Sequence, residues 1–92
     1  MYTPGYIYFA KSDSLLKVGF TTDPKRRIKT HKSSNPRFEL LAVLISYKEV
    51  ETLIHLKYKS VYLKEWHNLE DYLDITQDVI NLTTKIIMGN LL

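Results

Sequence analysis

The fold is decided by three segments near the amino terminus: Pro4-Gly-Tyr-Ile-Tyr-Phe9, Leu16-Lys-Val-Gly-Phe20 and Asp23-Pro-Lys-Arg-Arg-Ile-Lys-Thr-His31. Two short runs rich in β-forming residues are separated by a polar turn and lead straight into the start of a helix. We therefore expect an antiparallel hairpin followed by a helix. This substructure would gather tyrosines, a lysine, an arginine and a histidine, which are side chains that can bind and attack a phosphate.

Each strand of the expected hairpin alternates between two faces, because successive side chains of a strand point in opposite directions. In the first strand the alternation separates Tyr6, Tyr8 and Ala10 from Ile7 and Phe9. In the second it separates Leu16, Val18 and Phe20 from Leu15, Lys17 and Gly19. A glycine late in a strand indicates a bulge or a close approach of other atoms to the backbone, and we expect one of these at Gly19.

A basic helix should follow the hairpin. Thr22 or Asp23 can cap it, Pro24 suits its first turn, and the pattern carries it to about Lys32 with Ile28 as its one obvious core contact. The next segment, residues 38–45, is almost continuously apolar. That pattern is typical of a strand buried on both faces, so we expect this strand at the centre of a small sheet.

The rest of the chain predicts two more helices. Ser46 and Glu49 have the spacing of a capping box. The helix after them would bury a stripe formed by Val50, Leu53, Ile54, Lys57, Tyr58 and Val61. Trp66 would anchor the following loop, and a last helix would start at Thr76 or slightly earlier and stop at Gly89. The predicted order is β-β-α-β-α-α, an α+β fold in a single domain over residues 1–92.

Composition limits the classes of function. The 92 residues include no cysteine, which excludes disulfides and thiolate metal sites and favours a reducing compartment. The amino terminus lacks the pattern of a signal peptide, and no run approaches the ~20 apolar residues that a membrane span needs. We expect no membrane association and an intracellular location, cytoplasmic or, in a eukaryotic or viral setting, nuclear.

The positive charge is concentrated in the first part of the chain. Residues 1–37 contain eight lysines or arginines against two aspartates, whereas residues 38–92 contain five lysines against eight acidic residues. The two segments carry formal charges of +6 and −3. Such asymmetry marks the amino-terminal part as a surface for an anionic partner.

The motifs, taken in order, resemble the GIY-YIG endonuclease superfamily, and within it the phage and meiotic-gene branch whose second motif reads Lys-Ile-Gly. Gly5-Tyr-Ile-Tyr8 corresponds to the first motif and Lys17-Val-Gly19 to the second. Asp23–Ile28 with His31, then Glu51–His55, and finally Glu65-Trp66 complete the match, which covers residues 4–69. The resemblance implies a three-stranded antiparallel sheet flanked by helices and metal-dependent hydrolysis of phosphodiesters.

The resemblance also assigns the catalytic candidates. Arg27 falls at the position of the family's helix arginine, and a guanidinium can bind two oxygens of a phosphate at once. The motif tyrosine corresponds to Tyr8, favoured here, or to Tyr6. Lys17 stands where the wider superfamily has a second tyrosine and could supply the cation that such a tyrosine needs. His31 lies one helical turn after Arg27 and suits proton transfer.

Glu51 matches the metal ligand of the family, and the resemblance implies one Mg²⁺ or Mn²⁺ ion bound mainly together with substrate. His55, four residues later, is expected to orient Glu51 rather than to bind the metal. The acids from Glu65 to Asp78 are expected to lie outside the site, in a loop and helix. Trp66 is expected in the core rather than as a platform for bases, and His67 stands where we would expect an aromatic residue.

We thus expect an endonuclease that acts on nucleic acid, with DNA favoured as substrate. Further contacts to the nucleic acid would come from basic residues around the site: Lys11, Lys25, Arg26, Lys29 and Lys32. Intrinsic specificity should be low, or be supplied by a homodimer or a partner protein. Two alternatives remain open, which are a weakly active or inactive nucleic-acid-binding module of the same fold and a protein-interaction domain that uses the basic face.

Overall fold

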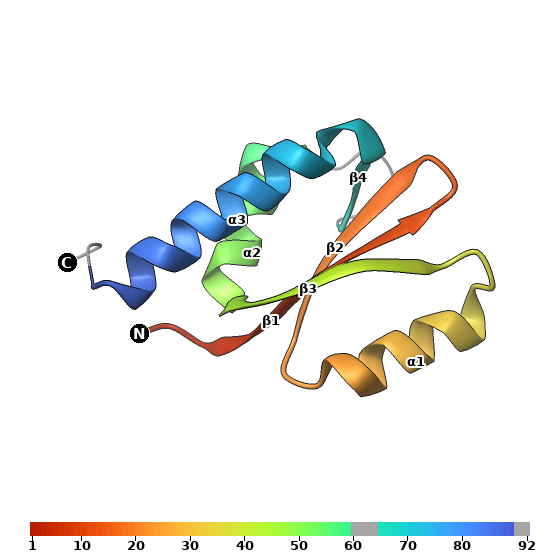
Figure 1. The fold of residues 1–92 in the computed structure, drawn as a ribbon, viewed down its shortest axis with the longest axis horizontal. Coiled ribbons are helices and arrows are strands. Elements are labelled where there is room, and N and C mark those ends of the chain that lie inside the picture. Colours follow the sequence, from red (N-terminus) through yellow and green to blue (C-terminus); the bar gives the residue numbers. More distant parts are fainter. Residues whose placement is uncertain (60–64, 90–92) are drawn as a thin grey trace.

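The computed structural model describes residues 1–59 and 65–89. Along these residues the elements are β1 (Pro4–Ser12), β2 (Leu15–Thr21), α1 (Pro24–Ser34), β3 (Glu39–Tyr47), α2 (Lys48–Lys57), β4 (Trp66–Asn68), a 3₁₀ turn η1 (Leu69–Asp71) and α3 (Tyr72–Ile87). Figure 1 shows the strands running between α1 on one side and the pair α2 and α3 on the other. The predicted α+β class with an antiparallel sheet is confirmed.

In the described residues the sheet contains four strands in the order β3-β1-β2-β4, with every neighbouring pair antiparallel. It therefore has one strand more than the three that the resemblance implied. The added strand is β4, in which Trp66 pairs with Lys17 and His67 with Leu16. The segment expected as a loop anchored by Trp66 is thus the short outer strand of the sheet.

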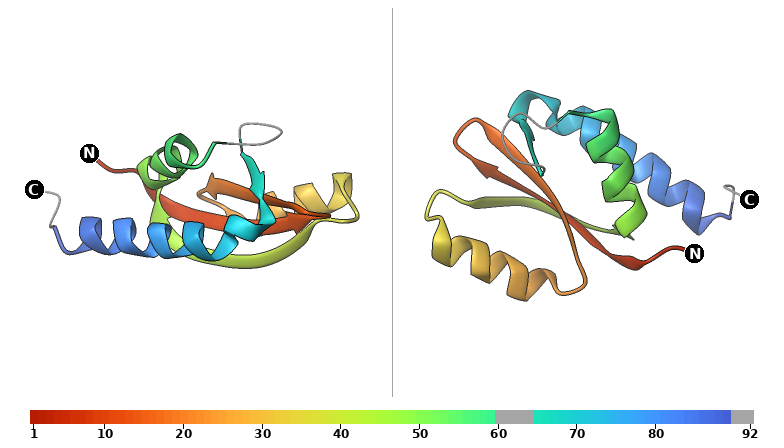
Figure 2. Two further views of the ribbon diagram at one scale, coloured as in Figure 1. Left: turned by 90° about the horizontal axis from the view of Figure 1, so that it is seen from above. Right: turned by 180° about the vertical axis from the view of Figure 1, so that it is seen from behind.

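One face of the sheet carries the main core. Ile7 and Phe9 from β1 and Leu16 and Val18 from β2 are fully buried there, as the alternation predicted. They pack against apolar residues of α2 and α3, chiefly Val50, Ile54, Ile75 and Val79. Both helices lie on this face in the two further views (Figure 2). Burial of these side chains at about 1.5–3 kcal/mol each is the main stabilising contribution that holds the helices to the sheet.

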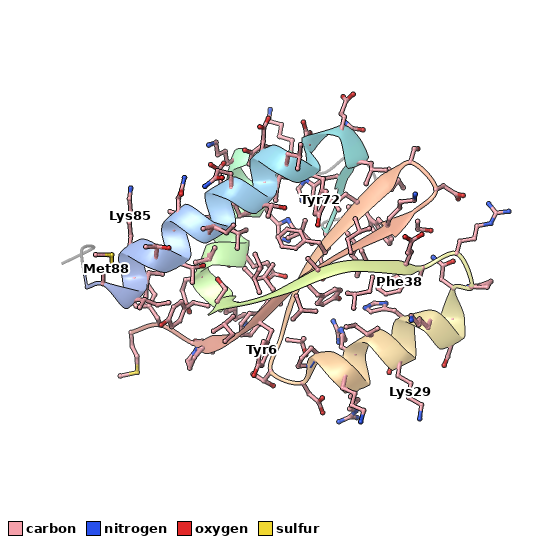
Figure 3. The ribbon with its side chains drawn as sticks, in the orientation of Figure 1. Tyr6, Lys29, Phe38, Tyr72, Lys85 and Met88 are labelled. Atoms are coloured by element: carbon pink, nitrogen blue, oxygen red, sulfur yellow. The ribbon has the colours of Figure 1, made fainter. Side chains whose placement is uncertain are left out.

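The opposite face is covered by α1 and holds a smaller cluster of Tyr8, Ala10 and Phe38, with Ile28 and Leu40 packed against it. Helix α1 begins as predicted, because the Asp23 carboxylate accepts a hydrogen bond from the backbone N–H of Arg26 and Pro24 occupies its first turn. Phe38 lies between α1 and the sheet, whereas Lys29 points away from both (Figure 3). Helix α1 therefore rests on the sheet through few apolar contacts and presents most of its charge to solvent.

The expectation that residues 38–45 form a central, fully buried strand is wrong. Strand β3 is at the edge of the sheet, and Ile45 is 72% exposed. Leu44 and Ala42 pack on the main core, but α1 does not extend over the other face at Ile45. The apolar run by itself therefore did not indicate how much of each face of β3 is covered by the helices.

The predicted capping box at the start of the second helix is also wrong. Strand β3 continues directly into α2, so Ser46 stays in the strand, where its buried hydroxyl lies 2.7 Å from the hydroxyl of Thr83. The Glu49 carboxylate instead accepts the backbone N–H of Thr3 at 2.8 Å. Val50 and Ile54 are buried as expected, whereas Leu53 and Lys57 are exposed, and Val61 lies outside the described residues.

Helix α3 starts at Tyr72, four residues before Thr76, because the 3₁₀ turn η1 leads straight into it. Its apolar stripe, formed by Ile75, Val79, Leu82 and Ile86, packs on the core. Gly89 follows its end with a φ of 72°, a left-handed conformation that favours glycine. Among the described residues no helix has both the length and the apolar character needed to cross a membrane.

Candidate functional site

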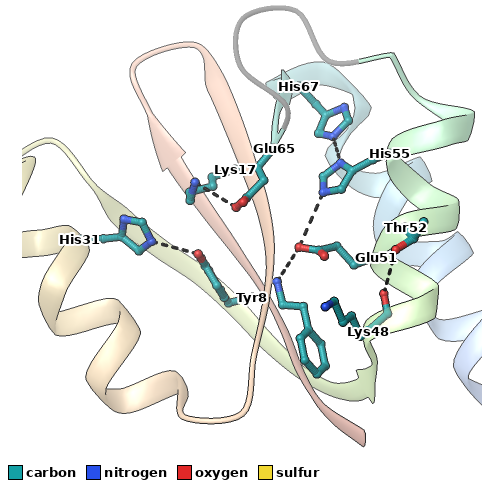
Figure 4. A network of polar contacts seen from close by, with 10 residues as sticks. Tyr8, Lys17, His31, Lys48, Glu51, Thr52, His55, Glu65 and His67 are labelled. Carbon is teal, nitrogen blue, oxygen red and sulfur yellow. Dashed lines mark hydrogen bonds and ion pairs between the residues drawn. The ribbon is translucent and has the colours of Figure 1, made fainter. Parts of the chain in front are cut away.

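Tyr8 lies at the centre of the sheet face that α1 covers, and its side chain is fully buried. Its hydroxyl is 3.0 Å from Nε2 of His31 on α1 (Figure 4). Gly19 lies opposite Tyr8 on β2, and a Cβ at that position would come within 2.5 Å of the tyrosine ring. The close approach predicted at Gly19 is therefore the Tyr8 ring, and only glycine leaves room for it.

Tyr6, the alternative motif tyrosine, occupies the same face two residues earlier but is partly exposed. Its neighbours across the sheet are Thr21 and the exposed Ile45. The structure thus brings Tyr8, and not Tyr6, into contact with His31.

Tyr8 and His31 are both held in their neutral forms. Burial raises the pKa of Tyr8 above its ordinary value near 10.0, and the neighbouring Arg27 offsets part of that rise. Burial also lowers the pKa of His31 below its ordinary value near 6.5, and the positive charges of Lys17 and Arg27 lower it further. At neutral pH the contact therefore joins a phenol to an uncharged imidazole, and a proton can pass between Tyr8 Oη and His31 Nε2.

The imidazole of His31 is fixed from its other side by Phe38. The two rings stack with their centroids 5.0 Å apart and an angle of 16° between their planes. Because α1 supplies His31 and the residue just before β3 is Phe38, packing of this helix on the sheet sets the orientation of the histidine.

Arg27 precedes His31 by one helical turn, and its side chain is largely exposed. The interaction with Tyr8 raises the pKa of Arg27 still further, so the guanidinium stays charged. Arg27 lines an open hollow of about 410 Å³ with Arg26, Thr30 and the residues of the β2–α1 connection, Thr21, Thr22 and Asp23. An anion in this hollow would meet both arginines.

The remaining basic candidates do not line this hollow. Lys25, Lys29 and Lys32 line a second shallow hollow along the outer surface of α1, and Lys11 is partly exposed on β1. The structure therefore places the predicted nucleic-acid-binding residues of α1 on exposed positions of a single helix. Arg37 is paired with Asp13 in the hairpin turn at 3.2 Å.

Lys17 stands on β2 next to Gly19 and is 8% exposed. Its ammonium lies 3.1 Å from Oε1 of Glu65 and 5.1 Å from the centre of the Trp66 ring. The backbone N–H of Val18 also donates to the carbonyl of Glu65 at 3.0 Å, which continues the pairing of β2 with the β4 segment. A carboxylate and an aromatic ring together hold Lys17 in place.

The expectation that Glu65 lies outside the site is thus wrong. Its negative charge is close enough to act on both Tyr8 and His31. It adds to the rise of the Tyr8 pKa and offsets part of the lowering of the His31 pKa. The signal that could have found it is Lys17 itself, because a lysine in the middle of a buried strand requires a counter-charge.

Glu51 extends from α2 to the edge of β2, beyond Lys17, where the pairing with β4 stops. Its Oε2 accepts the backbone N–H of Phe20 at 2.7 Å, and its side chain is 16% exposed. The backbone N–H of Phe20, which would otherwise lack a hydrogen-bond partner, therefore holds the Glu51 carboxylate in position.

A chain of contacts through His55 and His67 leads from Glu51 into the core. Nε2 of His55 is 3.7 Å from Glu51 Oε2, and Nδ1 of His55 is 2.8 Å from Nε2 of His67. His67, which the resemblance left as a departure from the expected pattern, is fully buried on β4 and holds the ring of His55.

Comparison with models of known families identifies the family of this chain. The family model of the T5orf172 domain matches residues 5–86, which include every residue of the site described above. The chain belongs to the T5orf172 domain family. No curated protein and no solved structure was found to match it.

The T5orf172 domain is associated with GIY-YIG-like and HNH-like nuclease-type domains of phages, which links the chain to nucleic acid. In this T5orf172 domain five polar side chains from different elements converge on the β2 strand and its edge. They are Tyr8 of β1, Lys17 of β2, His31 of α1, Glu51 of α2 and Glu65 just before β4.

The site fits a divalent cation only in part. Within residues 1–59 and 65–89, no three histidine or acidic side chains gather closely enough to hold a metal by themselves. Glu51 offers a fixed carboxylate, of which Oε2 bonds Phe20 while Oε1 makes no hydrogen bond within the described residues. One such carboxylate suits Mg²⁺ or Mn²⁺ when water and phosphate oxygens complete the shell.

Proposed function

We propose that this T5orf172 domain is a metal-dependent endonuclease of the GIY-YIG type, with DNA as its favoured substrate. The observation that carries the proposal is the Tyr8–His31 contact between two neutral groups, flanked by the cations of Arg27 and Lys17, with Glu51 held at the adjoining strand edge. Hydrolysis of a phosphodiester needs a proton acceptor, cations for the phosphate charge and a site for a metal ion.

Each residue has one task in this proposal. Arg27 binds non-bridging oxygens of the phosphate and neutralises the charge that gathers there in the transition state. The attacking water gives a proton to Oη of Tyr8 as Tyr8 passes its own proton to Nε2 of the uncharged His31. Water oxygen bonds to phosphorus, the bond to the departing sugar oxygen breaks, and that oxygen takes up a proton from solvent.

Glu51 would hold the divalent ion. When bound, the ion supplies Lewis-acid stabilisation of charge on the phosphate and the leaving oxygen. The chain's own contribution is to fix the carboxylate, which it does through the Phe20 N–H.

One observation favours a second candidate, a nucleic-acid-binding module that does not cleave. Tyr8 is fully buried and Lys17 is occupied by Glu65. The nuclease proposal therefore requires a phosphate to take the place of the Glu65 carboxylate beside Lys17. A domain in which this exchange fails would bind the backbone through α1 alone.

Incubation with supercoiled plasmid separates the two candidates. The nuclease proposal expects nicked and then linear DNA in the presence of Mg²⁺ or Mn²⁺, and none after chelation with EDTA. Retention of the plasmid by the protein, with no metal-dependent product, would instead establish the binding module.

A further inference from the structure

His55 has a buried ring nitrogen without a partner. Its Nε2 makes no hydrogen bond to any described residue, and almost no surface of this atom is accessible to solvent. The nitrogen points at Oε2 of Glu51 across 3.7 Å, as Figure 4 shows. That separation is too long for a hydrogen bond, for which N–H···O distances are about 2.7–3.2 Å.

The other nitrogen of His55 is fixed. Its Nδ1 lies 2.8 Å from Nε2 of His67, the two ring planes are parallel to within 1°, and His67 is fully buried on β4. Histidines that bind metals typically donate the N–H of the second ring nitrogen to an acceptor, which sets the tautomer and aims the free nitrogen at the ion. His67 Nε2 can accept that proton when His67 carries its own proton on Nδ1, a buried atom that also lacks a partner among the described residues. With these tautomers His55 Nε2 is a bare electron pair facing Glu51.

The distance between the two facing atoms is slightly longer than the separation of two ligands of one ion, so a bound ion would draw the two side chains a little closer together. Ligand atoms bonded to a common cation at about 2.0–2.2 Å lie roughly 3–3.5 Å apart. His55 Nε2 and Glu51 Oε2 are 3.7 Å apart, and both come from α2 at positions i and i+4. A bare nitrogen beside a carboxylate is unfavourable by itself, and a cation between them removes that conflict.

We propose that His55 Nε2 is a second protein ligand of the divalent ion at Glu51, and that His67 is the residue that orients it. This inference rests on the proposed metal site and goes beyond it, since His55 was expected only to orient the carboxylate. A donor set of one carboxylate and one imidazole suits Mn²⁺ and later first-row ions better than Mg²⁺, which favours oxygen ligands alone. The site is therefore selective for Mn²⁺ over Mg²⁺.

Pulsed electron paramagnetic resonance of Mn²⁺ tests this directly, because it detects a ¹⁴N nucleus bonded to the ion. The sample is the full chain with Mn²⁺ and a short DNA duplex. We expect nitrogen coupling in the unchanged protein, its loss in His55→Gln with Mn²⁺ affinity reduced about tenfold or more, and Mg²⁺ affinity within about twofold. His31→Gln is the matched control, since it removes a histidine that does not contact Glu51 and should keep the coupling.

The outcomes distinguish this inference from the proposed function. Absence of nitrogen coupling in the unchanged protein, with Mn²⁺ binding lost in Glu51→Gln, would overturn the role of His55 and leave Glu51 as the ligand. Equal Mn²⁺ binding in Glu51→Gln and the unchanged protein would overturn both. The nitrogen coupling is measured on the unchanged protein, so this part of the test does not depend on whether any variant folds.

Discussion

The two faces of the central hairpin use the same two strands for different purposes. Towards α2 and α3, strands β1 and β2 present Ile7, Phe9, Leu16 and Val18, all fully buried and apolar. Towards α1 the alternating positions are Tyr8, Lys17 and Gly19, where every polar group has a specific partner or neighbour. The first face is held by extensive apolar packing, and the second by a small apolar cluster together with a few directed polar contacts.

This difference shows how a domain of 92 residues accommodates a site without a separate scaffold. Because a strand alternates strictly, one face can bear the stability while the other bears chemistry. A residue on the first face should matter to folding, and a residue on the second to function.

The largest expected effect is on the core face. Phe9→Ala should lower the free energy of unfolding by about 3–5 kcal/mol, because it removes a fully buried ring and leaves a cavity. Its neighbour on the other face, Tyr8→Phe, should cost about 1 kcal/mol, since it removes only the hydroxyl contact to His31. Urea unfolding followed by circular dichroism measures both. Equal losses in the free energy of unfolding would show that the two faces contribute equally to stability.

On the opposite face we expect loss of activity with little loss of stability. Arg27→Ala should reduce metal-dependent cleavage by about 10²–10³-fold, because a cation aimed at the transition state is removed. Lys85→Ala, which changes an exposed cation of α3 outside the site, is the matched control. Loss of the cooperative thermal transition in Arg27→Ala would make this arginine a structural residue.

The outer surface of α1 should contribute to affinity alone. Changing Lys25, Arg26 and Lys29 together to Gln should weaken DNA binding and reduce the slope of log K against log salt by about 2–3. A triple variant to Gln of exposed lysines elsewhere, Lys48, Lys59 and Lys85, has the same net charge as the first triple variant and serves as its control. If both triple variants lost the same affinity, binding would depend on net charge rather than on α1.

The smallest expected effect concerns pH. The pKa of His31 is lower in the folded protein than its unfolded value near 6.5, chiefly because of burial, so the unfolded chain binds the proton more readily. The contribution of His31 to stability is complete above that unfolded value and falls as the pH drops through the folded one. His31→Gln should therefore flatten the loss of stability in mild acid, measured by urea unfolding across that range, and an unchanged pH dependence would contradict the assignment.

The sequence predicted what depends on local pattern. The alternation in residues 6–10 and 16–20 set both faces of the hairpin, and Asp23 with Pro24 set the start of α1. The resemblance assigned Tyr8 and His31 to one site, but the contact between their side chains was not predicted.

What the sequence missed depends on contacts between distant parts of the chain. A strand of three residues, Trp66–Asn68, is too short to show alternation, so the position of His67 beside His55 could not be deduced. For Glu65 the one signal was the need of Lys17 for a counter-charge, which does not say which acidic residue supplies it. The exposure of β3 at Ile45 depends on where α1 stops covering the sheet, and no local pattern encodes that.

The proposed endonuclease depends most directly on Glu51 as the residue that holds the divalent ion, and one paired measurement tests this. Plasmid cleavage and DNA affinity are measured for the unchanged protein and for Glu51→Gln in Mn²⁺. We expect Glu51→Gln to lose cleavage while it binds DNA as tightly or more tightly, because an anionic charge near the backbone is removed. Full cleavage by Glu51→Gln would contradict the metal site and, with it, the proposed endonuclease.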